Sequence, residues 1–302
     1  MGLFDRTISL TLPLVPKPVV RYFSRPYVAG TTMAAALNVV RELAQRGAVS
    51  TLDILGEFVS REEEAGANTE AYIALIKQIE AEGLREAHVS VKLTALGLLL
   101  DSNRCLEKMR RLTGQAEASG NFVRIDMEDS GCTDETLAIY RRLREEFGNE
   151  RVGVVFQSRL HRTAADVDAV ASPEANFRLC KGIYLEPESI AYTQDQAIRE
   201  SFIEILDRMF SCGVYVGIAT HDDWLVERSI ELIERHGLTR DRYEFQMLLG
   251  VREPLRQELI DDGHRLRVYV PFGGNWYAYS VRRLRENPQI AGHVLRALVR
   301  RG

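Results

Sequence analysis

Phe122-Val-Arg-Ile-Asp-Met127, the stretch 133–147 and Val152-Gly-Val-Val-Phe-Gln157 follow one another along the chain and predict a strand, a helix and a strand. The two short runs are rich in β-branched and aromatic residues, which is typical of buried strands. The segment between them has the apolar spacing of an amphipathic helix. The same unit recurs on both sides of this stretch.

Apolar runs of strand length occur throughout the chain, with helical stretches between them. The candidate strands are 50–56, 88–94, 122–127, 152–157, 177–182, 214–219, 243–248 and 266–271. The helical stretches include 68–82, 101–118, 133–147, 195–210 and 223–236. Eight strand–helix units predict an α/β protein with a closed (β/α)8 barrel. An open doubly wound sheet is the weaker interpretation, because no G-x-G-x-x-G motif follows a candidate strand.

No change of composition marks a linker, so we predict one barrel domain over residues 49–302. An N-terminal helical extension over residues 1–48, with a helical pattern at 32–46, precedes it. The net charge of −4 argues against a nucleic-acid-binding protein. Cysteines are widely spaced and form no C-x-x-C pair, which indicates reduced thiols in a cytoplasmic protein. No run reaches the roughly 18 apolar residues that a membrane-spanning helix needs.

Polar side chains fall at the C-terminal ends of the candidate strands, where barrel enzymes carry their active sites. They are Glu57, Lys92, Asp126, Gln157, Arg178, Lys181, Thr220, His221, Asp222, Gln246 and Tyr269. A single one of these has an ordinary structural explanation, such as an ion pair inside the barrel. Together they give nearly every strand a polar end, which a purely structural barrel does not need. Because Lys92, Arg178, Lys181 and the tandem pair Arg282-Arg283 are cationic, we expect anionic ligands.

The residue types at these strand ends limit the reaction classes. Only His221-Asp222 combines histidine and carboxylate at a strand end, so no metal site is predicted. No G-x-S-x-G elbow is present for nucleophilic hydrolysis. Lys92, flanked by apolar barrel residues, could have a lowered pKa and attack a carbonyl. A Schiff-base lyase or aldolase acting through Lys92 is therefore an alternative, and a non-catalytic anion-binding barrel is another.

The strand-end motifs resemble those of the proline dehydrogenase family in its monofunctional bacterial, FAD-dependent form. The matching segments are Leu52-Asp-Ile-Leu-Gly-Glu57, Ser90-Val-Lys-Leu-Thr-Ala-Leu96, Arg124-Ile-Asp-Met-Glu128, Arg178-Leu-Cys-Lys-Gly-Ile-Tyr184, Ala219-Thr-His-Asp222, Glu244-Phe-Gln-Met-Leu248 and Tyr269-Val-Pro-Phe-Gly-Gly-Asn-Trp-Tyr-Ala-Tyr-Ser-Val-Arg-Arg-Leu-Arg-Glu-Asn-Pro288. They cover residues 52–288 in the family's order. The chain departs from the family pattern at Ser158-Arg-Leu-His161, at Cys180 and at Phe272, without loss of a charged site residue.

The resemblance implies oxidation of L-proline to Δ1-pyrroline-5-carboxylate, with FAD as the cofactor and a membrane quinone as the electron acceptor. It also implies roles for individual residues. The catalytic residues would be Asp126 and Arg178. The substrate ligands would be Lys92, Tyr184, Leu248, Tyr269, Arg282 and Arg283. The cofactor ligands would be Met127, Gln157, Arg178, Lys181, Gly182, Ile183, Thr220, His221 and Glu286.

Two further expectations follow from the resemblance. Glu57 would pair with Arg282 when the substrate carboxylate is absent, and so act as a gate, because an unpaired buried guanidinium is costly. Delivery of electrons to a membrane quinone would require transient docking of a cytoplasmic protein on the inner membrane face. Residues 1–20 or the basic segment 293–301 would make that contact.

Overall fold

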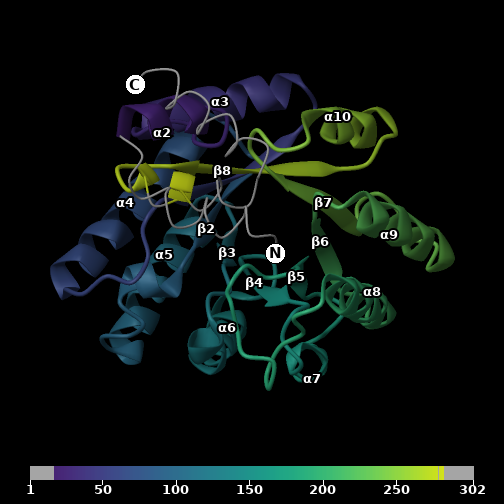
Figure 1. Ribbon diagram of the computed structural model, residues 1–302. Coiled ribbons are helices and arrows are strands. Elements are labelled where there is room, and N and C mark those ends of the chain that lie inside the picture. Colours follow the sequence, from purple (N-terminus) through teal and green to yellow (C-terminus); the bar gives the residue numbers. More distant parts are fainter. Residues whose placement is uncertain (1–16, 278, 282–302) are drawn as a thin grey trace, which may run out of the picture.

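The computed structural model describes residues 17–277 and 279–281 and contains a closed barrel of eight parallel strands (Figure 1). The strands pair in chain order: β1 (Val49–Ile54), β2 (Ala87–Val91), β3 (Val123–Ile125), β4 (Val152–Gln157), β5 (Asn176–Cys180), β6 (Tyr215–Ala219), β7 (Tyr243–Leu248) and β8 (Leu266–Phe272). β8 pairs with β1 in parallel register and closes the barrel. The predicted (β/α)8 fold is confirmed.

Helices surround these strands (Figure 1). They are α4 (Glu62–Ala81), α5 (Ser102–Ala118), α6 (Thr133–Phe147), α7 (Thr163–Asp168), α8 (Asp195–Ser211), α9 (Asp223–Arg235) and α10 (Glu253–Asp261). The predicted helix 68–82 begins earlier, at Glu62, where three glutamates in the first turn complement the positive end of the helix dipole. The periodicity did not predict α7 and α10, because the first has only six residues and the second nine.

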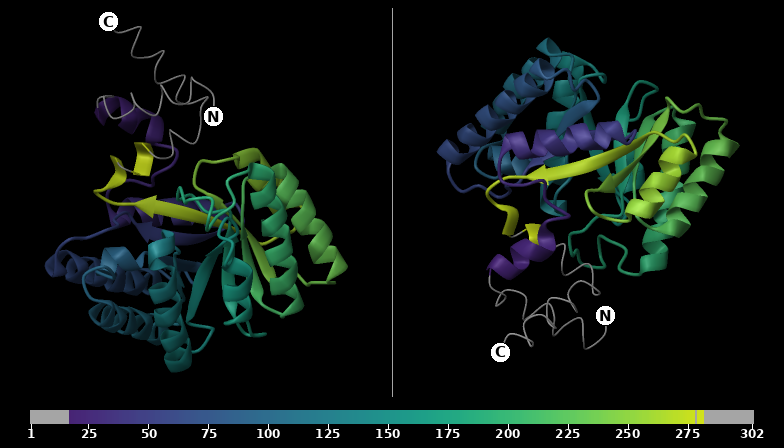
Figure 2. Two further views of the ribbon diagram at one scale, coloured as in Figure 1. Left: turned by 60° about the horizontal axis from the view of Figure 1, so that its bottom comes forward. Right: turned by 90° about the horizontal axis from the view of Figure 1, so that it is seen from above.

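From residue 17 on, where the description of the chain begins, α2 (Lys17–Ser24) and α3 (Met33–Gln45) precede the barrel, and α3 matches the predicted pattern at 32–46. Buried apolar side chains of α3 belong to the same core cluster as the barrel strands. In both views of Figure 2, α2 lies outside the ring of helices and next to the segment that follows β8. There Tyr27, Leu55 and Tyr279 form a small apolar cluster of their own. The domain boundary between residues 48 and 49 stays a prediction.

The strand predicted over 88–94 is too long, because β2 ends at Val91. Lys92 instead begins the short 3-10 helix η2 (Leu93–Leu96), which ends at Gly97 with φ of 89°. Glycine suits this left-handed conformation because it has no Cβ. The turn leaves Lys92 at the end of its strand, where its side chain reaches over the barrel.

Charged side chains fill much of the barrel interior, where branched apolar residues are more usual. Arg124, Arg178, Glu244 and Arg267 are each at most 5% exposed. Space for Arg124 comes from Gly153, because a Cβ there would meet the Arg124 guanidinium and the carbonyl of Asn176. The interior is therefore a hydrogen-bonded polar network on which the site rests.

Candidate active site

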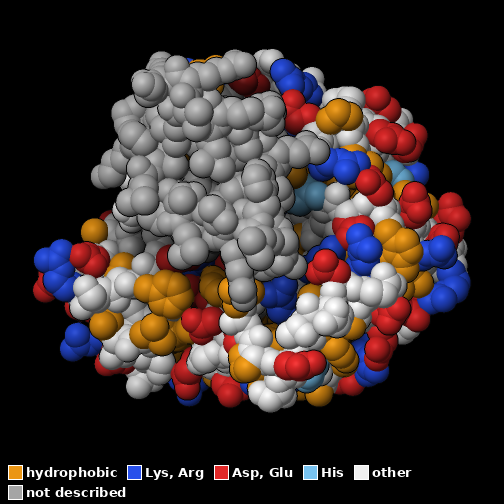
Figure 3. Space-filling model, in the orientation of Figure 1, with side chains coloured by type: hydrophobic (Ala, Val, Ile, Leu, Met, Phe, Trp, Pro, Cys, Tyr) orange, Lys and Arg blue, Asp and Glu red, His pale blue; other side chains and the backbone are white. Residues whose placement is uncertain are grey.

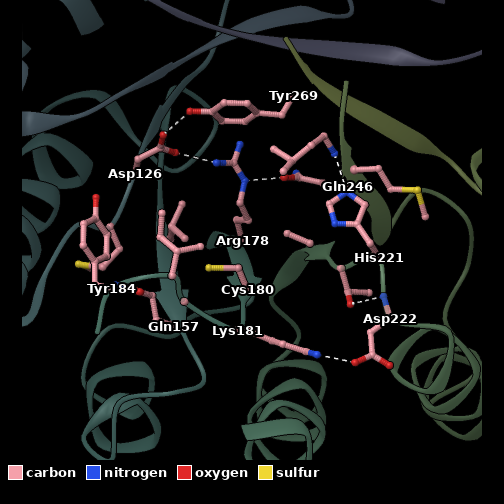
Figure 4. Close-up of a pocket in the computed structure, with 18 of the residues that line it drawn as sticks. Asp126, Gln157, Arg178, Cys180, Lys181, Tyr184, His221, Asp222, Gln246 and Tyr269 are labelled. Carbon is pink, nitrogen blue, oxygen red and sulfur yellow. Dashed lines mark hydrogen bonds and ion pairs between the residues drawn. The ribbon is translucent and has the colours of Figure 1, made fainter. Parts of the chain in front are cut away.

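A cavity of about 680 Å³ opens at the C-terminal ends of the strands (Figure 4). Most of the predicted site residues line this one cavity: Lys92, Asp126, Met127, Gln157, Arg178, Lys181, Gly182, Ile183, Tyr184, Thr220, His221, Leu248 and Tyr269. They come from β2 to β8 or from the segments directly after them. The structure thus brings together residues that the sequence separates by up to 177 positions, as Lys92 and Tyr269 are.

The centre of the cavity is a cluster around the Asp126 carboxylate. Its Oδ2 accepts hydrogen bonds from the Tyr269 hydroxyl at 2.7 Å and from Lys92 Nζ at 3.3 Å. Its Oδ1 accepts from Arg178 Nη1 at 2.7 Å and from Ser90 Oγ at 2.5 Å. Four donors therefore fix one carboxylate that is 8% exposed. The arrangement holds two cations side by side at the cavity wall.

Lys92 has a second carboxylate partner, Asp53 on β1, which the sequence analysis missed. Asp53 Oδ2 accepts from Lys92 Nζ at 3.0 Å, and its Oδ1 accepts from the Tyr72 hydroxyl of α4 at 3.2 Å. Asp53 is 1% exposed. A charged residue inside an otherwise apolar strand was the available signal, because such a group needs a buried partner.

The protonation states in this cluster follow from burial and from charge pairing. Burial lowers the pKa of Lys92, but the carboxylates of Asp53 and Asp126 more than offset this and hold the pKa well above its usual value. Burial raises the pKa of Asp126, yet Lys92 and Arg178 reverse the direction and lower it. Burial raises the pKa of Asp53, with a contribution from Asp126. The lysine is therefore held charged.

Arg178 lies between Asp126 and Gln246 in the close-up (Figure 4). Its Nε donates to the Gln246 side-chain oxygen, and its Nη1 is engaged with Asp126 and Ser90. Its guanidinium lies 5.4 Å from the centre of the Tyr269 ring. Its Nη2 is buried and has no hydrogen-bond partner among the described residues. Because an unpartnered buried donor costs about 1–3 kcal/mol, this N–H is suited to a ligand in the cavity.

A second polar cluster lies at the other side of the cavity (Figure 4). Asp222 Oδ2 accepts from Lys181 Nζ and, at 2.8 Å, from Arg199 Nε of α8. His221 Nε2 accepts the backbone N–H of Leu248 at 2.8 Å, so this ring nitrogen carries no proton. Arg199 was not expected at the site from the sequence, because this residue belongs to a helix rather than to a strand end.

Among the described residues, the predicted site residue Glu57 is not part of this cavity lining. Glu57 is half-buried in the segment after β1. Arg282, Arg283 and Glu286 lie outside the described residues, so the pairing of Glu57 with Arg282 stays a prediction. Residues 276, 277 and 279–281, which precede the arginine pair, are helical.

Positive charge predominates in the cavity. Of the described side chains that line it, five are lysine or arginine and three are aspartate. In Figure 3, basic and histidine side chains lie beside a hollow in the described surface. This charge excess suits anionic ligands. Among the same residues no group of His, Cys, Asp and Glu could hold a metal ion.

The helices that the structure describes include none long and apolar enough to cross a bilayer.

Tyr184 and Ile183, predicted for the substrate and the cofactor respectively, belong to the segment after β5. The Tyr184 carbonyl accepts from Arg159 Nη1 at 2.6 Å, and Glu186 accepts from the Ser130 backbone N–H at 2.7 Å. These two bonds fix the segment against the residues that follow β4 and against the 3-10 turn that precedes α6.

Comparisons with known proteins agree with this architecture. A family model described as Proline dehydrogenase matches residues 36–296. The chain is 35% identical over 277 residues to Proline dehydrogenase of Deinococcus radiodurans, which covers 91% of this chain and 89% of that protein. It is 35% identical over 281 residues to Proline dehydrogenase 1 of Bacillus subtilis (strain 168), which covers 93% and 92% respectively.

A solved structure has the same barrel fold. The crystal structure of proline utilization A (PutA) from Bdellovibrio bacteriovorus, inactivated by N-propargylglycine, matches with a TM-score of 0.82 and 24% identity. The match covers 88% of this chain and 32% of that one, so this chain spans about a third of its length.

Proposed function

The chain belongs to the proline dehydrogenase family, and from this membership we propose that it oxidises L-proline to Δ1-pyrroline-5-carboxylate with FAD as cofactor and a quinone as electron acceptor. The observation that carries the proposal is the buried cluster of Lys92, Asp126, Arg178 and Tyr269 at the wall of the cavity. It offers two fixed cations and an aromatic ring to a small amino acid.

The described residues fit a flavin nucleotide. Arg178 Nη2 is buried and has no hydrogen-bond partner among the described residues, which suits an acceptor on the flavin ring. Lys181 and Arg199 supply positive charge for the pyrophosphate. At Gly182, with φ of 94°, a Cβ would collide with Gln157, so the bare backbone there can approach a ligand closely. Met127, Gln157, Ile183, Thr220 and His221 would complete the cofactor site, with Glu286.

The chain's own residues would bind and orient the substrate. Lys92, with Arg282 and Arg283, would hold the proline carboxylate, and Tyr184, Leu248 and Tyr269 would pack against the ring. Cations beside the substrate lower the pKa of its ammonium group, which favours the neutral amine. When bound, FAD would accept a hydride from the carbon next to that nitrogen. Asp126 would keep both Lys92 and Arg178 in place for this.

Two observations disfavour the Schiff-base alternative. A nucleophilic lysine needs a lowered pKa, whereas two carboxylates hold the pKa of Lys92 well above its usual value. Lys92 also donates to Asp53, Asp126 and Tyr269, which leaves its nitrogen without the lone pair that attack on a carbonyl requires.

The proposal also includes a gate at Glu57 and contact with the membrane. Glu57 would act as the gate for Arg282. The protein would be cytoplasmic and would dock transiently on the inner membrane face to reach the quinone. Deletion of residues 1–20 or 293–301, followed by co-sedimentation with liposomes, tests the contact; unchanged binding for both deletions would refute it.

Anaerobic spectroscopy tests the reaction. The purified protein should be yellow, and its flavin absorbance should bleach when L-proline is added. A colourless protein that takes up no FAD would refute the flavoenzyme assignment. If borohydride instead trapped a substrate covalently on Lys92, the lyase alternative would hold.

A variant pair tests the substrate site. We expect Lys92→Met to raise the proline KM about tenfold or more, because a hydrogen bond to a charged group is lost. Bound FAD should stay near the wild-type amount. Lys77→Met, at an exposed position on α4, is the matched control and should change neither quantity. Equal KM values for the two variants would remove Lys92 from the substrate site.

A further inference from the structure

We propose that Glu244 and Gln246 form a positioning relay that fixes the guanidinium of Arg178 from beneath the cavity. Neither residue is part of the roles assigned above, and the inference deepens the proposed function because Arg178 is the residue offered to the flavin. Glu244 and Gln246 both belong to β7 and are 1% and 5% exposed. The relay runs from Glu244 through Gln246 to Arg178, and Figure 4 shows its last link.

The contacts are continuous from one side chain to the next. Glu244 Oε1 accepts from Gln246 Nε2 at 2.6 Å, and the Gln246 side-chain oxygen accepts from Arg178 Nε. Arg178 Nη1 then donates to Asp126 Oδ1 at 2.7 Å. With Nε and Nη1 held, the planar guanidinium has one orientation, and its unpartnered Nη2 is fixed with it.

Donor and acceptor chemistry at both ends dictates the direction of the Gln246 amide. A guanidinium only donates and an ionised carboxylate only accepts, so the amide oxygen must face Arg178 and the amide nitrogen must face Glu244. Burial raises the pKa of Glu244, but Arg267 and Arg265 overcome it and lower the pKa to about 2. Glu244 is therefore an acceptor at neutral pH.

A missing side chain makes room for the relay. In the strand register, Gly217 on β6 pairs with Arg178 on β5 and with Glu244 on β7. A Cβ at Gly217 would collide with the amide nitrogen of Gln246. Gln246 is at the next inward-facing position of β7 after Glu244. Its side chain thus fills the space beside Gly217, between Arg178 and Glu244.

Glu244 is itself fixed from below. Its Oε1 also accepts from Arg267 Nε at 2.7 Å, and its Oε2 accepts from Arg265 Nε at 3.3 Å. Arg267 Nη1 donates to the backbone carbonyls of Ser50 and Glu86. The orientation of Arg178 therefore depends, through Gln246, Glu244 and Arg267, on the backbone of β1 and of the segment before β2. It does not depend on contacts within the cavity alone.

The test uses three variants that separate the relay from general stability. Gln246→Met keeps the side-chain length and removes the acceptor of Arg178. Glu244→Gln removes the carboxylate that orients the amide. Arg256→Met is the control, because it deletes a buried arginine of α10 that pairs with Glu253, outside the relay.

The first readout does not require a cofactor. In protein labelled with 15N-arginine, the Arg178 Nε–H signal is assigned from its loss in Arg178→Lys. Gln246→Met and Glu244→Gln should both shift this signal, although Glu244 does not contact Arg178, and Arg256→Met should leave it in place. If Glu244→Gln left the signal unchanged while its melting temperature matched the control, the relay would be overturned.

The second readout concerns the flavin. Gln246→Met and Glu244→Gln should raise the FAD dissociation constant about tenfold. They should also make the flavin midpoint potential more negative, because a loosened cation stabilises the reduced anionic ring less. Arg256→Met should change neither the FAD dissociation constant nor the midpoint potential. A wild-type protein that bound no FAD would refute the proposed function, while the arginine signal would still decide the relay.

Discussion

At the scale of single residues, Asp126 shows why a buried, paired carboxylate affects the free energy of unfolding more than an exposed one does. It is hydrogen-bonded to Lys92, Arg178, Tyr269 and Ser90, and its charge offsets two buried cations. Removal of one partner from a buried ion pair leaves the other charge uncompensated, which is strongly destabilising. An exposed pair costs little, because water replaces the lost partner.

Asp126→Asn is therefore expected to lower the free energy of unfolding by about 3 kcal/mol. Asp134→Asn is the matched control, since the Asp134 side chain is 80% exposed in its pair with Arg162. This control should change stability by less than about 1 kcal/mol. Urea unfolding curves measure both changes, and equal losses for the two variants would contradict the argument.

Glu128 is a buried carboxyl whose ionisation makes the stability of the fold depend on pH. Its Oε1 accepts the Thr94 backbone N–H at 2.9 Å, and its Oε2 contacts the Thr94 hydroxyl. Thr94 in turn accepts from the backbone N–H of Phe58, so the contact links the ends of β3 and β2 to the segment after β1. Burial raises the pKa of Glu128 from 4.5 to about 7, against the opposing hydrogen bonds from Thr94.

Because the folded state raises this pKa, the stability contribution is complete below pH 4.5 and is lost as the pH rises through about 7. Between about pH 5 and pH 8, the wild type should lose on the order of 3 kcal/mol relative to Glu128→Gln, which keeps both contacts with Thr94. Glu146→Gln is the control, because its pair with Arg110 lowers the pKa of Glu146. Urea unfolding across this pH range measures the difference, and parallel profiles for wild type and Glu128→Gln would count against it.

At the scale of elements, glycines decide how closely strands and side chains approach. A Cβ at Gly153 on β4 would meet the Asn176 carbonyl of β5 and would lie 2.5 Å from Arg124 Nη1 on β3. At Gly66 in α4, nothing lies within 4 Å of the same atom. One glycine is therefore required by packing, and the other only weakens a helix.

Gly153→Ala should lower the free energy of unfolding by about 3 kcal/mol, because neither neighbouring backbone nor the buried Arg124 can yield. Gly66→Ala should raise it by roughly 0.5–1 kcal/mol through helix propensity. Thermal melts of the two variants check the opposite signs. A tolerated alanine at position 153 would mean that β4 and β5 can move apart.

The elements also show where sequence periodicity was informative. Long amphipathic helices such as α5 and α6 matched their predicted ranges closely, because their apolar spacing extends over several turns. The six-residue α7 has too little of that pattern to be recognised. The end of β2 was placed three residues late, because Leu93 and Thr94 look like strand residues although they form a buried 3-10 turn.

The candidate site was predictable to the extent that strand ends converge in a barrel. Lys92, Asp126, Arg178 and Tyr269 follow from that rule, and the resemblance assigned their roles. Asp53 had a signal in the sequence, as a charged residue inside an apolar strand. Its bond to Lys92 and the contacts of Glu244 could not be predicted, because they depend on which side chains meet inside the barrel. Arg199 was missed for a related reason, since it reaches the cavity from a helix.

At the scale of the whole molecule, the cavity draws on seven of the eight strands, so a ligand bound there should stabilise the entire barrel. If FAD binds only the folded state, a hundredfold excess over its Kd should add about 2.7 kcal/mol of stability. Removal of the cofactor should lower the melting temperature accordingly, as scanning calorimetry with and without FAD would show. A melting temperature that does not respond to FAD would contradict binding in this cavity.

The bond between Lys92 and Tyr269 spans 177 positions of the chain. During synthesis on the ribosome, Lys92 and Asp126 emerge long before β8 does. Until then, Lys92 and Asp126 lack their hydrogen bonds with the Tyr269 hydroxyl, and the barrel lacks the strand pair between β8 and β1 that closes it. Assembly of the site is consequently among the last events in the biogenesis of this polypeptide, and a nascent chain truncated before residue 269 cannot contain a complete one.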